Sequence, residues 1–191
     1  MNQLVTEWHD YHSLRPNNTV NGMMRIAQDV YSPQLDNKRD ILVWLPPSYP
    51  YQHKKRYPVL YFFDGQNLFD ANTSYAGEWH IDETMITLSQ EGLEAIIVGL
   101  PNNNQRHLEY NPFEHSNIGN GKGDKTIEFI YQTVKPMIDH EFRTLPDRLN
   151  TGLGGSSMGG AMALFGYLAY PHVFGLCAAL SPAYWYGGQK M

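Results

Sequence analysis

The chain of 191 residues has little of what would point to several common classes of protein. Its one cysteine, Cys177, excludes an internal disulfide. It has 14 Lys and Arg against 19 Asp and Glu, and the resulting net charge of −5 provides no basic face for nucleic acid. No apolar run is long enough to cross a membrane, and the N-terminus lacks a basic segment followed by an apolar run. We therefore expect a cytoplasmic protein without a signal peptide, a membrane span or a nucleic-acid partner.

The length and composition favour one globular domain over residues 1–191. A hydrophobic content of 42% in a chain of this size is sufficient for a sizeable core. Internal repeats, low-complexity segments and linkers are not found in the sequence. Cys177 lies among Leu176, Ala178 and Leu180, so we expect a buried strand there with an inert thiol.

The apolar segments predict an antiparallel hairpin followed by alternating strands and helices. The expected strands are residues 22–32, 39–46, 58–63, 95–100, 149–153 and 174–180. The expected helices are residues 81–90, a helix with its apolar face between Ile127 and Ile138 that Pro136 should kink or split, and a helix from Met158 to just before Pro171. A long polar loop is expected over residues 101–124. This order predicts an α/β fold with a mostly parallel sheet, an N-terminal antiparallel hairpin and helices on both faces.

The stretch with the most chemical content is Gly155-Ser156-Ser157-Met158-Gly159. It matches Gly-x-Ser-x-Gly, the nucleophile elbow, in which a serine lies on a strained turn between a strand and a helix. The small flanking residues allow the strand and the helix to pass closely. A short apolar strand before the motif and an apolar face at helical spacing after it are both expected here. Ser157 is therefore the candidate nucleophile.

The groups that would activate this serine are not evident after it. No Asp or Glu follows Ser157, and the only later histidine is His172. His172 lies past the far end of the expected helix, about 20 Å away at 1.5 Å per residue, whereas a base must reach within about 3 Å. His107 and His115 lie in the long polar loop, which leaves the same sheet edge as Ser157. Either is an alternative base, against the simpler interpretation that both are solvated loop residues.

Six blocks of sequence, in order, resemble the esterase family called "Putative esterase". The blocks are residues 57–69, residues 78–83, Arg106 with Glu109 and Tyr110, residues 155–160, residues 170–175 and residues 181–185. The family has the α/β-hydrolase fold and includes esterase D-like S-formylglutathione hydrolases, feruloyl and acetyl-xylan esterases, enterochelin esterases and mycobacterial mycolyltransferases. The resemblance covers about residues 20–186.

This resemblance implies roles for three residues. Ser157 is the expected nucleophile, and the backbone N–H groups of Gln66 and Met158 are the expected oxyanion hole. The family pattern places the acid and then the histidine after two further strands. Since the sequence ends after the sixth expected strand, the resemblance predicts a domain that is incomplete at its C-terminus, with the last strands missing and little activity.

The implied function is that of a serine carboxylic-ester hydrolase acting through an acyl-enzyme on Ser157. The expected substrate is a small-molecule or carbohydrate ester, with no cofactor and no metal. An acyltransferase of the same family and a non-catalytic, hydrolase-like binding domain are the alternatives. Residues 174–180 are expected to form an exposed apolar sheet edge through which copies of the chain associate.

Several other residues have two interpretations. Arg106, Glu109 and Tyr110 either fix the long loop through an ion pair and a packed ring, or line the substrate site. His80 is expected to pack or to face the mouth of the cleft. His9 and His12 are too near the N-terminus to predict a metal site.

Overall fold

The computed structural model describes residues 7–75, 77–115 and 119–185, with only the backbone of Glu114, His115 and Gly119. The strands are β1 (His9–Asp10), β2 (Met23–Ser32), β3 (Asn37–Leu45), β4 (Val59–Phe63), β5 (Ile96–Leu100), β6 (Glu114–His115), β7 (Gly119–Asn120), β8 (Thr151–Ser156) and β9 (Leu176–Leu180). The helices are α1 (Tyr11–Leu14), α2 (Ile81–Ser89), α3 (Arg106–Glu109), α4 (Gly123–Phe129), α5 (Lys135–Glu141) and α6 (Met158–Ala169). Shorter turns are the 3-10 helices η1 (Gly65–Asn67) and η3 (Arg148–Asn150) and the π-helical turn η2 (Ile130–Val134).

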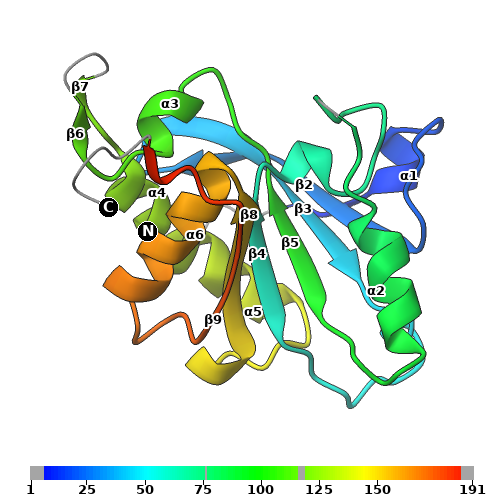
Figure 1. Cartoon of the computed structure of the whole chain (residues 1–191). Helices are drawn as coiled ribbons and strands as arrows, with labels where there is room; N and C mark the ends of the chain where they lie inside the picture. The colour runs from blue at the N-terminus through cyan, green and yellow to red at the C-terminus, as the bar shows by residue number, and fades with distance from the viewer. Residues whose placement is uncertain (1–6, 76, 116–118, 186–191) are drawn as a thin grey trace.

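The main sheet has the strand order β1-β2-β3-β5-β4-β8-β9 (Figure 1). Strands β1, β2, β3 and β5 pair antiparallel in succession, while β5, β4, β8 and β9 form a parallel block. The predicted α/β architecture, with its N-terminal antiparallel hairpin, is thereby confirmed. Because β4 and β8 are parallel neighbours, their C-terminal ends lie side by side at the same end of the sheet.

Two apolar cores cover the two faces of this sheet. Alternate residues of β4 face opposite ways, so Tyr61 and Phe63 belong to one core and Phe62 to the other. Helices α4, α5 and α6 cover the first face, with Ile127 and Met162 in its core. On the second face the core is closed by α1, by Leu68 and Phe69 after η1, and by α2. Helices α1 and α2 lie on the opposite side of the strands from α6 in Figure 1. The described part of the chain contains no helix long and apolar enough to cross a membrane.

The break expected at Pro136 begins one turn earlier. The π-helical turn η2 separates α4 from α5, and Pro136 lies in the first turn of α5. A wider turn before a proline relieves the clash between its ring and the preceding carbonyl group, and a proline in a first turn lacks only an N–H that has no helical partner there. The long loop expected over residues 101–124 also contains structure, namely α3 and the β6–β7 hairpin.

The strand before the elbow starts later than predicted. Leu149 lies in η3 with 67% of its surface exposed, because the Asp147 carboxylate accepts hydrogen bonds from the backbone N–H of Leu149 and the side chain of Asn150 and holds a turn there. The strand proper, β8, packs tightly on β4. A Cβ atom at Gly154 would lie 2.5 Å from the Phe62 ring, so glycine is required at that position.

The expectation that Cys177 lies in a buried strand is wrong. β9 is the last strand of the described sheet, Cys177 is exposed, and Leu176 and Leu180 are 42% and 50% exposed. A strand with a neighbour on one side only keeps part of its apolar surface in solvent, whatever its composition. Desolvation nevertheless raises the pKa of the Cys177 thiol, which keeps it in the unreactive protonated form.

Candidate active site

Ser157 occupies the turn between β8, which ends at Ser156, and α6, which begins at Met158. Its backbone has φ 55° and ψ −120°, and the residue is exposed. Such a conformation costs a non-glycine residue about 1–3 kcal/mol and persists only where the surroundings hold it. Two hydrogen bonds do so here: the Ser157 N–H donates to Leu180 O at 3.0 Å, and the Ala183 N–H donates to Ser157 O at 2.9 Å.

The glycine spacing around this turn has a direct steric cause. A Cβ atom at Gly155 would lie 2.5 Å from the carbonyl carbon of Gly159, so α6 can cross the end of β8 only if residue 155 has no side chain. Ser156, by contrast, is the last residue of β8 and half-buried. The structure therefore places Ser157, and not Ser156, on the exposed turn.

The two candidate oxyanion donors lie at the starts of helical turns. Met158 is the first residue of the twelve-residue helix α6, and Gln66 is the second residue of η1. The first N–H groups of a helix lack intrahelical acceptors and lie at the positive end of the helix dipole. Both positions are therefore compatible with the oxyanion role that the family resemblance implies, which stays a prediction.

The turn that contains Gln66 is fixed from several sides. Thr73 Oγ1 donates to Gln66 O at 2.7 Å, and the Asn102 N–H donates to Gln66 Oε1 at 3.1 Å. The Trp79 N–H donates to the carbonyl oxygen of Asn67 at 2.9 Å. This rigid setting is what a preorganised donor needs.

An ion pair links this turn to the elbow. Asp64, the left-handed residue that precedes η1, accepts two hydrogen bonds of 2.8 Å from Arg106 and one of 2.7 Å from Asn102 Nδ2. Arg106 Nη1 also contacts Met158 Sδ at 3.2 Å. A Cβ atom at Gly159 would lie 3.2 Å from Asp64 Oδ2. The residue two before Gln66 and the residue two after Ser157 are therefore in contact.

Glu109 and Tyr110 anchor the other side of α3. Glu109 pairs with Arg39 at 2.8 Å, and both side chains are almost wholly buried. The Tyr110 hydroxyl accepts a hydrogen bond from the Asp64 N–H at 3.0 Å. Burial, and then the nearby Asp64 charge, raise the pKa of Tyr110 well above its usual value, so the phenol stays neutral. Arg106 and Glu109 thus each form an ion pair with a residue outside α3, and these pairs and the packed Tyr110 ring hold the loop; a role in lining the substrate site stays a prediction.

The histidines do not complete a triad in the described structure. His172 lies beyond α6, at the end opposite Ser157. The centre of its ring lies 6.3 Å from that of Tyr131 and 6.2 Å from that of Tyr170. His107 is exposed on α3, and the side chain of His115 lies outside the described part of the chain. We assign the base to none of these three residues.

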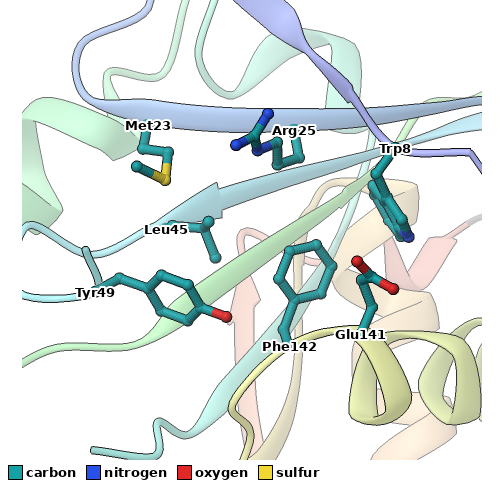
Figure 2. A pocket seen from close by; sticks show the side chains of 7 residues that line it. All are labelled: Trp8, Met23, Arg25, Leu45, Tyr49, Glu141 and Phe142. Carbon is teal, nitrogen blue, oxygen red and sulfur yellow. The ribbon is translucent and has the colours of Figure 1, made fainter. Parts of the chain in front are cut away.

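Two cavities lie at different places relative to the elbow. One of about 350 Å³ is lined by Trp8, Met23, Arg25, Leu45, Tyr49, Glu141 and Phe142 (Figure 2). Leu45 is the last residue of β3, which runs antiparallel to the block of parallel strands. The cavity therefore lies near the N-terminal ends of the parallel strands, whereas Ser157 lies at their C-terminal ends. The other, of about 280 Å³, is polar and includes Arg15, Asp70 and Thr73. Thr73 also binds the Gln66 carbonyl group, so this second cavity adjoins the candidate oxyanion turn.

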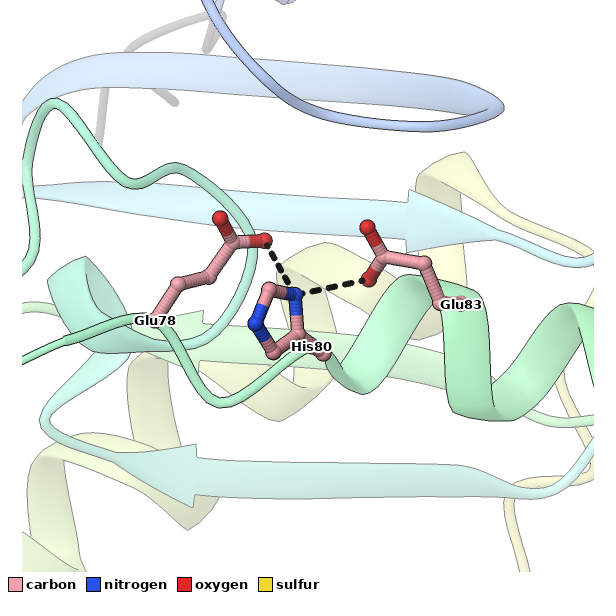
Figure 3. A group of neighbouring side chains, drawn as sticks. All are labelled: Glu78, His80 and Glu83. Carbon is pink, nitrogen blue, oxygen red and sulfur yellow. Dashed lines mark ion pairs between the residues drawn. The ribbon is translucent and has the colours of Figure 1, made fainter.

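Sequence reasoning missed one cluster of side chains. Glu78, His80 and Glu83 converge where the loop after η1 enters α2 (Figure 3). Their Glu-x-His-x-x-Glu spacing was the available signal, but a loop-to-helix boundary hides which side chains meet. The side chain of His80, expected to pack or to face a cleft, is 66% exposed.

Comparisons with known proteins identify the family and the fold. Residues 32–188 match the model of the family described as "Putative esterase". The uncharacterized protein YbbA of Bacillus subtilis (strain 168) is 27% identical over 155 residues, which are 78% of this chain and 58% of that protein.

Solved structures of an esterase and of a serine hydrolase also resemble this chain. A ferulic acid esterase is 28% identical with a TM-score of 0.61, over 85% of this chain and 60% of its own. An IroE-like serine hydrolase from Shewanella oneidensis is 24% identical with a TM-score of 0.71, over 87% of this chain and 52% of its own. The chain thus spans between about half and three-fifths of the length of these proteins.

Proposed function

We propose, because the chain belongs to the "Putative esterase" family and has the α/β-hydrolase fold, that it takes part in the hydrolysis of a carboxylic ester and that Ser157 is the nucleophile. The observation that carries this proposal is the exposed, strained backbone of Ser157 between β8 and α6. That conformation points the hydroxyl group out of the sheet edge, beside the free amides of a helix start.

The chemistry follows the usual course of acyl transfer. The Ser157 hydroxyl oxygen attacks the ester carbonyl carbon while a base takes its proton, and the carbonyl oxygen becomes an oxyanion. The N–H groups of Met158 and Gln66 would hold that oxyanion. The protonated base gives its proton to the leaving alkoxide oxygen, so that collapse releases the alcohol and leaves an acyl-enzyme on Ser157. Water, deprotonated by the same base, then attacks the acyl carbonyl carbon, and the second collapse returns the proton to the Ser157 oxygen and releases the acid.

Asp64 and Arg106 act in this scheme as positioning residues. Neither is placed to touch the reacting atoms, but their ion pair keeps the Gln66 turn beside the start of α6. Misplacing an oxyanion donor by about 1 Å can cost roughly a hundredfold in rate. The loss of this pair should therefore lower kcat more than it changes KM.

The base and its acid are the parts this proposal does not place in the chain. The family pattern puts both after the nucleophile. In this sequence the residues after Ser157 include one histidine, His172, and no Asp or Glu. Without them, the chain by itself should retain only the contribution of the oxyanion donors and of substrate binding.

For the substrate we propose a small-molecule or carbohydrate ester. The relative at 28% identity is named as a ferulic acid esterase, and that name indicates an aromatic acid on the acyl side. The cavity beside Thr73 is lined by Arg15, Asn17 and Asn72, whose guanidinium and amide groups are of the kind that bind sugar or other hydroxyl groups. An acyl acceptor other than water would enter the same site, so acyl transfer differs from hydrolysis only in the second step.

Covalent labelling tests the assignment of the nucleophile. We would treat the wild-type chain, Ser157→Ala and the matched control Ser156→Ala with a fluorescent phosphonate, with imidazole added as a substitute base, and locate the label by peptide mass spectrometry. We expect a label on Ser157 in the wild type and in Ser156→Ala, and none in Ser157→Ala. A label on Ser156, or no specific label with imidazole present, would refute the assignment.

A further inference from the structure

We propose that Glu78, His80 and Glu83 form a binding site for a divalent first-row transition-metal cation, with zinc as the representative ion. The three ligand atoms are Glu78 Oε1, His80 Nδ1 and Glu83 Oε2, which all lie within 4.8 Å of one another (Figure 3). The site lies at the start of α2, on the sheet face opposite α6, and is independent of the ester chemistry proposed for Ser157.

His80 lies at ion-pair distance from both glutamates, at separations too long for hydrogen bonds but suited to a shared cation. His80 Nδ1 lies 3.6 Å from Glu78 Oε1 and 3.6 Å from Glu83 Oε2. A separation of 3.6 Å is too long for an N–H···O hydrogen bond. The same two separations would subtend about 120° at a cation lying about 2.1 Å from each atom, which is close to the angles and bond lengths found in zinc sites.

Glu78 has a buried carboxylate oxygen without a hydrogen-bond donor, which independently indicates a cation-binding role. Its side chain is only 5% exposed, yet Oε1 is buried with no hydrogen-bond donor among the described residues. Its other oxygen, Oε2, accepts from Thr19 Oγ1 at 3.0 Å. Glu83 Oε2 is likewise buried without a hydrogen-bond donor of good geometry in the described chain, and the neighbouring Asp82 carboxyl group lies close enough to interact with the Glu83 carboxylate. A buried carboxylate oxygen without a hydrogen-bond donor is costly, and a cation between the two glutamates would offset that cost for both.

Neighbouring residues orient the ligands in the way that metal sites require. Asn21 Nδ2 donates to Glu83 Oε1 at 2.8 Å, so the second oxygen of Glu83 is turned toward His80. Thr19 does the same for Glu78. Hydrogen bonds to the non-ligating atom of each carboxylate are typical of the outer shell of a metal site.

The donor set selects the class of cation. One imidazole nitrogen with two carboxylate oxygens suits zinc and its first-row neighbours, whereas calcium and magnesium favour oxygen ligands only. His80 is 66% exposed, so the cation would have an open side for water. The site therefore resembles a three-ligand centre with a fourth, solvent-filled position.

A cation here would bridge the loop before α2 and the first turn of that helix, and the segment before β2 would support it through hydrogen bonds. Glu78 and His80 precede α2, Glu83 lies in its first turn, and Thr19 and Asn21 come from the segment before β2. The Ile81 N–H, between these ligands, donates to Leu68 O just after η1. The expected role of the site is to stabilise the loop that follows η1.

Zinc titration of the purified 191-residue chain tests the proposal. We would measure the dissociation constant by competition with a chromophoric chelator, and compare Glu78→Gln, His80→Asn and Glu83→Gln with wild type. Asparagine tolerates the left-handed backbone of His80, so this variant removes the ligand without disturbing the turn. His53→Ala and Glu91→Gln, which change an exposed histidine and an exposed glutamate elsewhere, are the matched controls.

We expect one zinc ion per chain with micromolar or tighter affinity, weakened at least about tenfold in each ligand variant and unchanged in both controls. At a free zinc concentration of a hundred times the dissociation constant, Tm should rise by roughly 5–10 °C in the wild type and much less in the variants. Comparing Tm of the variants in chelator shows whether they fold. Failure to bind one zinc ion, equal affinity in the ligand variants, or tighter binding of calcium or magnesium would each overturn the proposal.

Discussion

The ion pair between Asp64 and Arg106 should make Arg106→Ala one of the more destabilising changes outside the apolar core. The substitution removes two 2.8 Å hydrogen bonds from a carboxylate that is only 6% exposed, and leaves Asn102 as its remaining side-chain donor among the described residues. It also removes a guanidinium group that stacks 4.8 Å from the centre of the Tyr110 ring.

The size of the effect follows from burial. Breaking a buried pair by deleting one partner costs about 3–5 kcal/mol, because the other charge is stranded. Water reaches Arg106, which is 26% exposed, so we expect a loss of about 2–4 kcal/mol in the free energy of unfolding. That is a large share of the roughly 5–15 kcal/mol typical of a domain, and corresponds to a fall in Tm of roughly 5–15 °C.

Urea unfolding at low protein concentration would measure this loss, and a second substitution identifies its cause. Asp64→Asn in the Arg106→Ala background removes the stranded charge, and asparagine tolerates the left-handed conformation of residue 64 (φ 58°), so the double variant should recover a large part of the loss. Arg148→Ala, at an exposed arginine with a hydrogen bond to Pro171 O, is the control and should cost less than about 1 kcal/mol. The reasoning is refuted if Arg106→Ala matches this control, or if the second substitution adds a further loss.

Three other expectations follow. The 191-residue chain should hydrolyse p-nitrophenyl acetate barely above background, since a serine without its base loses most of its rate; fast turnover that Ser157→Ala abolishes would instead indicate His107 or His115 as the base. Association of copies through β9 should appear in size-exclusion chromatography as oligomers whose share rises with protein concentration. Leu180→Lys, which puts a charge on that exposed strand, should shift the distribution toward monomer. A wild-type chain that elutes as a monomer at all concentrations would contradict this. Gly155→Ala should lower the free energy of unfolding, measured in urea, by about 1–3 kcal/mol or more, because the Cβ atom of the alanine would clash with the Gly159 backbone. A smaller loss would mean that α6 can shift to accommodate the methyl group.

The sequence predicted most of the elements that position the site, because their signals are local. The strand–turn–helix context of Ser157 follows from glycine spacing and apolar periodicity, and both are present in the structure. The start of β8 was predicted too early, since apolar Leu149 is held in a turn by Asp147, a side-chain effect that hydropathy does not report.

Contacts between distant segments were beyond the reach of the sequence. Arg106 pairs with Asp64, and Glu109 with Arg39, across many intervening residues, so no local pattern could assign the partners. The exposure of Cys177 depends on which strands flank β9 in space, whereas its composition is that of an interior strand. The grouping of Glu78 with His80 depends on a left-handed residue at the start of α2 that the sequence does not mark.

The position of β4 in the sheet has a consequence for the order in which the molecule assembles. β4 pairs with β5, the next strand of the sheet along the chain, but its other edge pairs with β8, so that Val59 meets Thr151 only after all the intervening elements have been synthesised. Pairings between such distant segments form slowly, because a long loop must close first. Until β8 has been synthesised, the edge of β4 that it will cover keeps unpaired N–H and C=O groups that other chains can reach.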